Sequence, residues 1–313
     1  MHPASVLSES VPWPVHPALR PFVAAITGYR QEGLPPGQHR GLPSPYLTLI
    51  LTVDEPLHLA AHADPGQPPA RWDAMVGGLH ARPALIRHEG RQWGAQVALT
   101  PWGSRALLGC PAGALVCWDA DLADLFGGGA AALVEDFRAA SGWASRLAVV
   151  QTALLARLAA GDHRWTVPAE LREAWRLIHA DAGRVRIDAV ARAVGWSPRR
   201  LTARMRAETG LPPKTVARVA RFDRARRRLG GRVAAGRDWD LATLAAECGY
   251  ADQAHLTREW RSLSGLPPTG WVAAESGMLV ETGAAAEADA DGHRADHRFV
   301  QDRARPQVAR SVS

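Results

Sequence analysis

Apolar residues in the C-terminal third of the chain recur at the spacing of short amphipathic helices, and this pattern occurs twice. Between residues 187 and 271, two stretches share one order: an apolar helical stripe, a glycine with an aromatic residue, a second stripe, and Gly-Leu-Pro-Pro. The first stripes are Ile187, Val190, Ala191 and Val194 in one copy, and Leu241, Leu244, Ala245 and Cys248 in the other. Such a repeat predicts two copies of one supersecondary unit.

Glycine and capping residues predict a tight turn within each unit. Gly195 and Gly249 end the first helices, because glycine accepts the left-handed backbone at a helix end. Ser197 and Asp252 are good N-caps for the second helices. The inward positions of these second helices are Leu201, Met205, Leu256, Trp260 and Leu263. Two helices joined by a short glycine turn are typical of the DNA-reading helix-turn-helix, and a solenoid or protein-docking hairpin is the alternative.

The charge distribution favours the DNA-binding interpretation. From residue 181 to 275 the chain has 18 Arg or Lys against 10 Asp or Glu, a net charge of +8, whereas the whole chain carries +6. The positive charge is therefore concentrated in one segment, as expected of a phosphate-binding surface. Codon bias explains the preference for arginine, since Lys214 is the single lysine, but it does not explain this concentration.

Residues 171–274 resemble the DNA-binding domain of AraC/XylS-family bacterial transcription regulators. The resemblance covers both units, the connecting helix A-R-V-A-R-F-D-R-A-R-R-R-L at 217–229, and the block G-Y-A-D-Q-A-H-L-T-R-E-W of the second unit. That block departs from the family pattern at Ala254 (usually serine) and Leu256 (usually phenylalanine). Ala203 stands where the family often has a base-reading arginine, so the first unit is expected to read DNA through other residues.

The second helix of each unit is expected to enter the major groove, with the two grooves about 34 Å apart on one face of the DNA. Gln253 suits adenine and Arg258 suits guanine. The residues expected to contact bases are Arg199, Thr202, Arg206, Gln253, Thr257 and Arg258. The residues expected to contact phosphate are Arg200, Lys214, Arg218, Arg221 and Arg261. The alternative for some of these is that they solvate the connecting helix.

The first 160 residues show a different pattern. Residues 1–20 are proline-rich and are expected to lack regular structure until a short helix begins at His16. Short runs with strand propensity follow, separated by glycine and proline turns: 46–53, 57–59, 75–79 and 94–99. Four helices are then predicted, at 102–109, 122–126, 131–140 and 143–160. The stripe on the last helix, Leu147, Val150, Leu154, Leu155 and Leu158, is interpreted as core, with a dimerisation surface nearby.

The runs P-S-P-Y-L-T-L-I-L, M-V-G-G-L and G-A-Q-V-A-L-T-P-W-G-S-R resemble, more loosely, the N-terminal sensory domain of a subset of AraC-type regulators. The resemblance implies a cupin-like barrel followed by helices. The predicted fold class is thus α+β, with a β-barrel or sandwich-like N-terminal domain and an all-α C-terminal domain. The predicted divisions are a regulatory domain at 1–160, a linker at 161–167, a DNA-binding domain at 168–275 and a disordered tail at 276–313.

Composition narrows the class of protein. No run approaches 18 consecutive apolar residues, so no transmembrane helix is expected. The start of the chain lacks the basic and apolar pattern of a secretory signal, and a cytoplasmic, nucleoid-associated protein is expected. Cys110, Cys117 and Cys248 do not form a disulfide framework; Cys248 is expected in the core, and the other two are a redox pair or small buried residues.

An enzyme is the competing hypothesis. A cupin-like metal-dependent enzyme fused to a DNA-binding module would show His-x-His, but His58, His62, His80 and His88 do not form it. No cysteine has the Pro-Cys-His-Arg context of a DNA-repair methyltransferase. Gly127-Gly128-Gly129 lacks the lysine of a phosphate-binding loop. No catalytic residue, metal or cofactor is therefore expected.

The hypothesis is a sequence-specific DNA-binding transcription regulator, an activator or a repressor, gated by an effector or by dimerisation through its N-terminal domain. The expected partner is double-stranded promoter or operator DNA. A small-molecule effector, RNA polymerase and a second copy of the chain are further partners considered, and no membrane is expected. A purely architectural DNA binder is the third alternative.

Overall fold

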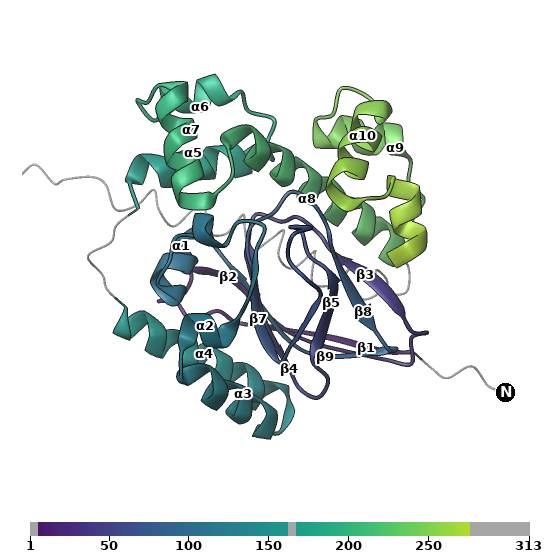
Figure 1. The fold of residues 1–313 in the computed structure, drawn as a ribbon. Helices are drawn as coiled ribbons and strands as arrows, with labels where there is room; N and C mark the ends of the chain where they lie inside the picture. Colours follow the sequence, from purple (N-terminus) through teal and green to yellow (C-terminus); the bar gives the residue numbers. More distant parts are fainter. Residues whose placement is uncertain (1–5, 162–166, 276–313) are drawn as a thin grey trace, which may run out of the picture.

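The computed structural model of the chain describes residues 6–161 and 167–275. A two-sheet N-terminal part lies beneath two groups of helices, which are joined by one long helix, α8 (Figure 1). This arrangement confirms the predicted α+β class and the all-α C-terminal part. The predicted disordered tail at 276–313 and most of the predicted linker lie outside the described residues.

The larger sheet has six antiparallel strands in the order β1-β2-β9-β4-β7-β10. Their bounds are Leu7–Trp13, Val23–Glu32, Arg91–Leu99, Leu47–Thr52, Ala74–Gly77 and Asp119–Asp121. The smaller sheet has the order β3-β8-β5-β6, with bounds Gly37–Gly41, Ala84–His88, Leu57–Ala61 and Ala70–Trp72. The expected strands near 46–53, 57–59, 75–79 and 94–99 are thus present as β4, β5, β7 and β9.

The two sheets remain separate, and the described residues form a sandwich-like pair rather than a closed barrel. The expectation for residues 1–20 is wrong where they are described. Leu7–Trp13 is a strand paired along its length with β2, so ladder hydrogen bonds override the local proline content. Residues 17–22 form a turn and not a helix, with the amide of Leu19 donating to the carbonyl of His16 at 2.8 Å.

Helices cover one face of the larger sheet. The bounds are Pro101–Gly103 for α1, Ser104–Leu108 for the π-type turn η1, Ala112–Leu115 for the 3-10 turn η2, Leu122–Phe126 for α2, Gly129–Ala139 for α3 and Gly142–Ala160 for α4. The helix expected at 102–109 is therefore irregular. Gly28 of β2 packs so closely on α4 that a Cβ there would lie 2.4 Å from the ring of Trp143. Leu147, Val150 and Leu154 are buried, which confirms their interpretation as core.

The C-terminal part contains the helices α5 to α10, and residues 268–275 form a further helical stretch beyond them. The bounds are Ala169–Ala180 for α5, Ile187–Ala193 for α6, Pro198–Thr209 for α7, Pro213–Ala234 for α8, Leu241–Cys248 for α9 and Gln253–Ser264 for α10. The connecting helix α8 is longer than the predicted 217–229, because Pro213 starts it one turn earlier. In the part of the chain that is described, no helix is long and apolar enough to span a bilayer.

Two large hydrophobic clusters meet within α8. The first contains the apolar residues of the larger sheet, of α3 and α4, and of α5 to α7, and it ends on α8 at Val216 and Ala217. The second begins at Val219 and contains the apolar residues of α9 and α10, including the fully buried Trp260. The first helix-turn-helix unit therefore shares a core with the N-terminal sheet and helices, whereas the second unit has its own.

Candidate nucleic-acid interface

Local chemistry fixes the first unit, α6 and α7. Gly195, at φ 70°, reverses the chain after α6. The Ser197 hydroxyl accepts a hydrogen bond from the backbone amide of Arg200 at 3.2 Å. Pro198 occupies the first helical position, where no amide donor is needed. The second helix ends at Gly210, whose φ of 76° is the left-handed conformation that favours glycine.

The second unit, α9 and α10, repeats this arrangement with aspartates as caps. The Asp240 carboxylate accepts hydrogen bonds from the backbone amides of Ala242 and Thr243, at 2.9 and 2.8 Å, and caps the start of α9. Asp252 accepts the amide of His255 at 2.6 Å and starts α10. The turns at Gly195 and Gly249 and the caps Ser197 and Asp252 predicted from the repeat are therefore confirmed, and Cys248 lies in the core as expected.

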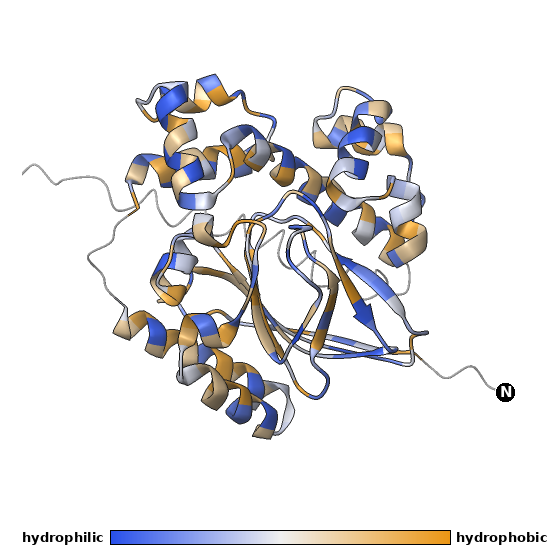
Figure 2. Cartoon of the chain, in the orientation of Figure 1, coloured by the Kyte–Doolittle hydropathy of each residue, from blue (hydrophilic) through white to orange (hydrophobic). Residues whose placement is uncertain are grey.

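The inward sides of α7 and α10 are fully buried. The residues predicted to face inward, each with 0% of its surface exposed, are Leu201, Met205, Leu256, Trp260 and Leu263. Because each helix has one buried side, the opposite side points away from the core, and hydrophilic residues are prominent on the helices of both units (Figure 2). This outward side is the surface available to a ligand as large as DNA.

The six residues predicted to contact bases lie on or beside this outward side. Arg199, Arg206, Gln253 and Arg258 are exposed, and among the described residues their side chains have no hydrogen bond or ion pair. Thr202 and Thr257 are half-buried, and the Thr202 hydroxyl donates to the carbonyl of Pro198 at 2.8 Å. Since the four exposed side chains are uncommitted, they can reorient toward the base edges of a groove.

The residues predicted to contact phosphate divide into two groups. Arg200, Lys214 and Arg261 are exposed, and the guanidinium of Arg200 lies 4.8 Å from the ring centre of Trp196. Arg218 and Arg221 instead bind a protein carboxylate. Their place in phosphate binding stays a prediction, and for Arg221 the geometry favours a role within the protein.

That carboxylate is Glu259, a buried residue of α10. Arg221 donates from Nε at 3.1 Å and from Nη2 at 3.3 Å, and the side chain of Arg221 is only 15% exposed. Arg218 adds a bond from Nε at 3.2 Å, with 39% of its side chain exposed. The two arginines thus tie α8 to α10. Sequence analysis missed this cluster, although an acidic residue between the inward positions Leu256 and Leu263 was a signal for it.

Other carboxylates neutralise part of the basic segment. Asp223 binds Arg226 at 2.8 Å and Arg227 at 2.9 Å; burial raises the pKa of this carboxyl, but the two charges hold it below its usual value overall. Glu247 binds Arg228 and Arg232. Several arginines of α8 are paired with carboxylates in this way. Among the described residues of the basic segment, the positively charged side chains that have no acidic partner are therefore concentrated on α7, on α10 and at Lys214.

Within residues 6–161 and 167–275, no group of three or more His, Cys, Asp or Glu side chains is placed to hold a metal ion. His62 instead meets Asp119 in a buried pair, with Nδ1 2.6 Å from Oδ2. The three cysteines are free thiols, and burial raises the pKa of Cys110 and Cys117, which disfavours their reactive thiolate forms.

Comparison with known proteins identifies the type of domain that these helices form. A family model described as "Helix-turn-helix domain" matches residues 190–274, which include all of α7, α8, α9 and α10. No curated protein matches the chain.

Solved structures of ToxT from Vibrio cholerae are similar to the chain. One, at 1.65 Å resolution, shares 9% identity, covers 86% of this chain and 98% of ToxT, and gives a TM-score of 0.47. A ToxT structure with an unsaturated fatty acid bound shares 7% identity, covers 86% of this chain and 95% of ToxT, and gives a TM-score of 0.46.

The family match begins within α6 and includes all of α7 to α10, so it spans both units. Residues 190–274 thus form a helix-turn-helix domain of the AraC type, and the chain is a DNA-binding transcription regulator.

Proposed function

We propose that the chain recognises a specific DNA sequence by placing α7 and α10 in successive major grooves. The main observation behind this proposal is that both helices have exposed polar side chains, without a hydrogen-bond or ion-pair partner among the described residues, on the side opposite their buried stripe. The rigid helix α8, 22 residues long, separates the two units and sets their spacing. Grooves one DNA turn apart, about 34 Å, are the target of such a pair.

Each proposed contact follows from side-chain chemistry. Gln253 pairs with adenine, and Arg258 pairs with guanine through two parallel hydrogen bonds. Arg199 and Arg206, with the nearby Thr202, read the other half of the site. Thr257, which is half-buried on α10, adds a contact to the half of the DNA site that α10 reads. Arg200, Lys214, Arg218 and Arg261 bind phosphate, and Arg221 acts mainly by holding Glu259.

Arg258→Ala and Lys214→Ala test this assignment, since both residues are exposed and neither has a partner among the described residues. Arg258→Ala is expected to relax the preference at one base pair by about 1–3 kcal/mol. Lys214→Ala is expected to weaken binding to all sequences alike and to reduce the salt slope by roughly 0.9. Competition binding at several salt concentrations measures both effects, and identical behaviour of the two variants would contradict the assignment.

We also propose that a small molecule acts through the N-terminal domain, residues 1–160. Thr27, Tyr29 and Gln31 pair across β2 and β9 with Gln96, Gly94 and Gln92 respectively, so these residues share one face of the larger sheet. Gln92 donates to Nδ1 of His39 on β3 at 3.0 Å, so this face points toward the smaller sheet.

The space between two packed sheets is normally filled by apolar side chains. Here the apolar residues between the sheets form a small cluster around Leu59, Met75 and Ile86, and the polar face continues beside it. Gln96 on that face is exposed, so solvent reaches it. Polar groups beside an apolar cluster can fix the orientation of a small ligand through hydrogen bonds.

A thermal-shift screen of the full chain against small metabolites, aromatic compounds and divalent metals tests the proposal. The expected result is a saturable rise in melting temperature that is lost in Gln96→Leu and kept in Gln38→Leu, an exposed glutamine of β3. A screen without any hit would favour dimerisation as the function of this domain.

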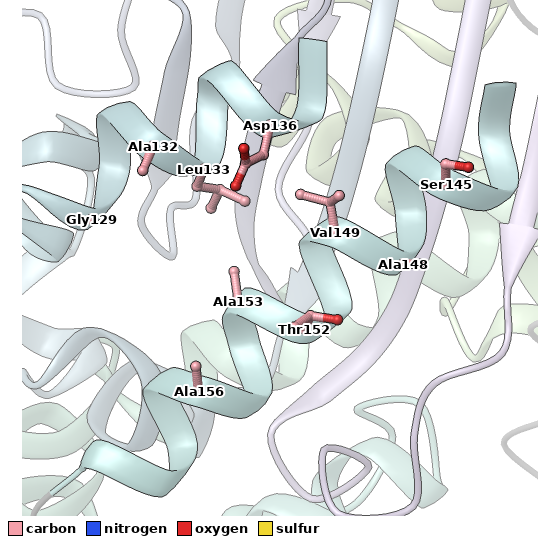
Figure 3. Close-up of a pocket in the computed structure, with 10 residues that line it drawn as sticks. All are labelled: Gly129, Ala132, Leu133, Asp136, Ser145, Ala148, Val149, Thr152, Ala153 and Ala156. Atoms are coloured by element: carbon pink, nitrogen blue, oxygen red, sulfur yellow. The ribbon is translucent and has the colours of Figure 1, made fainter. Parts of the chain in front are cut away.

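Dimerisation through the N-terminal helices is the second proposed route of regulation. An open groove of about 420 Å³ between α3 and α4 is lined mainly by small side chains, among them Ala132, Ala148 and Ala153 (Figure 3). Helices approach closely where such residues meet. Sedimentation of the wild type and of Ala153→Arg tests this route, since a bulky charge in the groove is expected to shift a dimer toward monomer.

We propose no catalytic activity for the chain. The expected place of action is the cytoplasm, where a DNA-binding regulator meets the nucleoid, and RNA polymerase is a proposed partner at the promoter. A purely architectural binder is distinguished by competition DNA: it would bind scrambled and selected sequences equally.

A further inference from the structure

The last turn of the recognition helix α7 rests on the N-terminal domain. Arg105 of η1 binds Glu208 of α7 through two bonds, with Nε–Oε1 at 2.6 Å and Nη2–Oε2 at 2.8 Å. Both side chains are largely buried, with exposed fractions of 20% and 10%. Such a bidentate pair fixes the direction of a carboxylate as well as its position.

The backbone beside this pair is equally close. A Cβ built on Gly113 of η2 would lie 2.9 Å from the amide nitrogen of Gly210 and 3.0 Å from the carbonyl oxygen of Ala207. A Cβ built on Gly210 would lie 2.4 Å from Cβ of Val116. Hence the end of α7 and the η2 turn touch with no room for a further side chain at either glycine.

The opposite side of this segment is bound to the N-terminal sheet and helices. Arg157 of α4 donates to the carbonyl of Leu107 in η1 at 3.0 Å. The amide of Cys117 donates to the carbonyl of Leu79 at 2.8 Å, just beyond β7. Residues 104–117, which we call the seat segment, therefore lie between α4 and β7 on one side and the end of α7 on the other.

We propose that the seat segment aims the recognition helix α7, and that Glu208 is a positioning residue for the bases read by the first unit. The inference rests on the proposed function, because it assumes that α7 reads bases. A change in the N-terminal domain that moves the seat segment then changes the sequence preference of α7, without any contact between an effector and DNA.

The dimensions of α7 make this coupling effective. The helix has 12 residues and is about 18 Å long. A tilt of about 10° at its seated end moves the other end, near Arg199, by roughly 3 Å. Hydrogen bonds to base edges tolerate far smaller displacements. The base-reading residues Arg199 and Arg206 stay exposed while the helix is seated, so the seat leaves the DNA-binding side open.

The second unit provides an internal reference. It also meets the N-terminal domain, where Arg40 of β3 binds Glu275 at 3.3 Å, but Glu275 lies beyond α10. Among the described contacts, no arginine of the N-terminal domain binds the last turn of the second recognition helix. The N-terminal domain approaches the end of α10 only at ordinary packing distance, since a Cβ built on Gly265 would lie 3.6 Å from Cγ of Pro83. Loosening the Arg105–Glu208 pair is therefore expected to affect the half of the DNA site that α7 reads, and to spare the half that α10 reads.

The test compares Glu208→Gln with Glu247→Gln in the full chain, using a selected duplex and duplexes altered in one half or the other. Glu247 also binds two arginines, but both belong to α8. Glu208→Gln is expected to reduce discrimination in the α7 half by about 3- to 30-fold, with the α10 half and the Glu247→Gln protein unchanged. An equal loss in both halves, or no loss, would overturn the inference.

Arg105→Lys keeps the charge but not the two parallel bonds, and it repeats the test if Glu208→Gln lowers the melting temperature. The double variant Arg105→Glu with Glu208→Arg exchanges the two charges and is expected to restore part of the discrimination in the α7 half. If both single variants are defective and the double variant recovers nothing, the two residues do not act as a direct pair. A wild-type protein without sequence preference would instead refute the proposed function itself, which separates the two failures.

Discussion

Gly249, in the turn of the second unit, lies directly against the side chain of Arg184, which belongs to the loop before the first unit. A Cβ at Gly249 would lie 2.2 Å from Cδ and 2.4 Å from Cγ of Arg184. Arg184 is held in turn by Asp181, at 2.8 Å. The loop before the first unit and the turn of the second unit therefore touch outside α8, through one glycine and one arginine.

Gly249→Ala is expected to cost more stability than Gly195→Ala, although the two glycines occupy the same place in the repeat. Both have a positive φ, 77° and 70°, and each alanine costs roughly 1 kcal/mol of backbone strain. Gly195 has no atom near its absent Cβ, whereas Gly249 must displace Arg184. Urea unfolding of the two variants measures the difference, and equal losses would show that the contact carries no weight.

Arg221→Ala is expected to destabilise the second unit by roughly 1–3 kcal/mol. The substitution removes one of the two arginines that compensate the buried carboxylate of Glu259, and an uncompensated buried charge is costly. It also removes the guanidinium that lies 5.1 Å from the ring centre of Tyr250. The control is Lys214→Ala, an exposed site on the same helix, and chemical unfolding that treats both variants alike would refute the structural role.

His39 is expected to make stability fall as the pH falls. Burial, with a smaller contribution from His88, lowers the pKa of His39 to about 3. Below pH 6.5 the unfolded chain takes up a proton that the folded chain does not accept until about pH 3, so acid favours unfolding. Each unit below pH 6.5 costs up to about 1.4 kcal/mol.

Unfolding free energies at pH 7.5 and 5.0 test this expectation. His39→Gln removes one titrating group and is expected to make the dependence less steep, although the lowered pKa values of His80 and His88 retain part of it. The exposed His16→Gln serves as the control. Parallel losses in the wild type and in His39→Gln would mean that another group governs the acid response.

The sequence was most informative where local chemistry decides the structure. Gly195, Ser197 and Asp252 act through their own backbone and nearest amides, so they predict the turns and caps of both units without knowledge of the rest. The buried stripes followed from helical spacing for the same reason. Where strand propensity was strong, as at Leu47–Thr52, the strand was also predicted.

The features that were missed depend on partners distant in the sequence. Leu7–Trp13 is a strand because β2 supplies its hydrogen bonds, and the prolines in and around it gave the opposite signal. Arg221 looks like any exposed arginine until Glu259 is placed beside it, and Arg105 meets Glu208 across more than 100 positions. Pairs of this kind leave no periodic pattern in the sequence, so they can be identified only in the folded structure.

The division between the two hydrophobic clusters has a consequence for how the protein unfolds. Because the division falls between Ala217 and Val219, the buried apolar residues of α5 to α7 belong to the cluster of the N-terminal part, and those of α9 and α10 belong to the other. The amides of the first unit are thus expected to exchange with solvent at the rate of the sheet, and those of the second unit at a rate of their own. A fragment that begins at α5 would therefore lack the N-terminal sheet and helices on which the apolar residues of α5 to α7 pack.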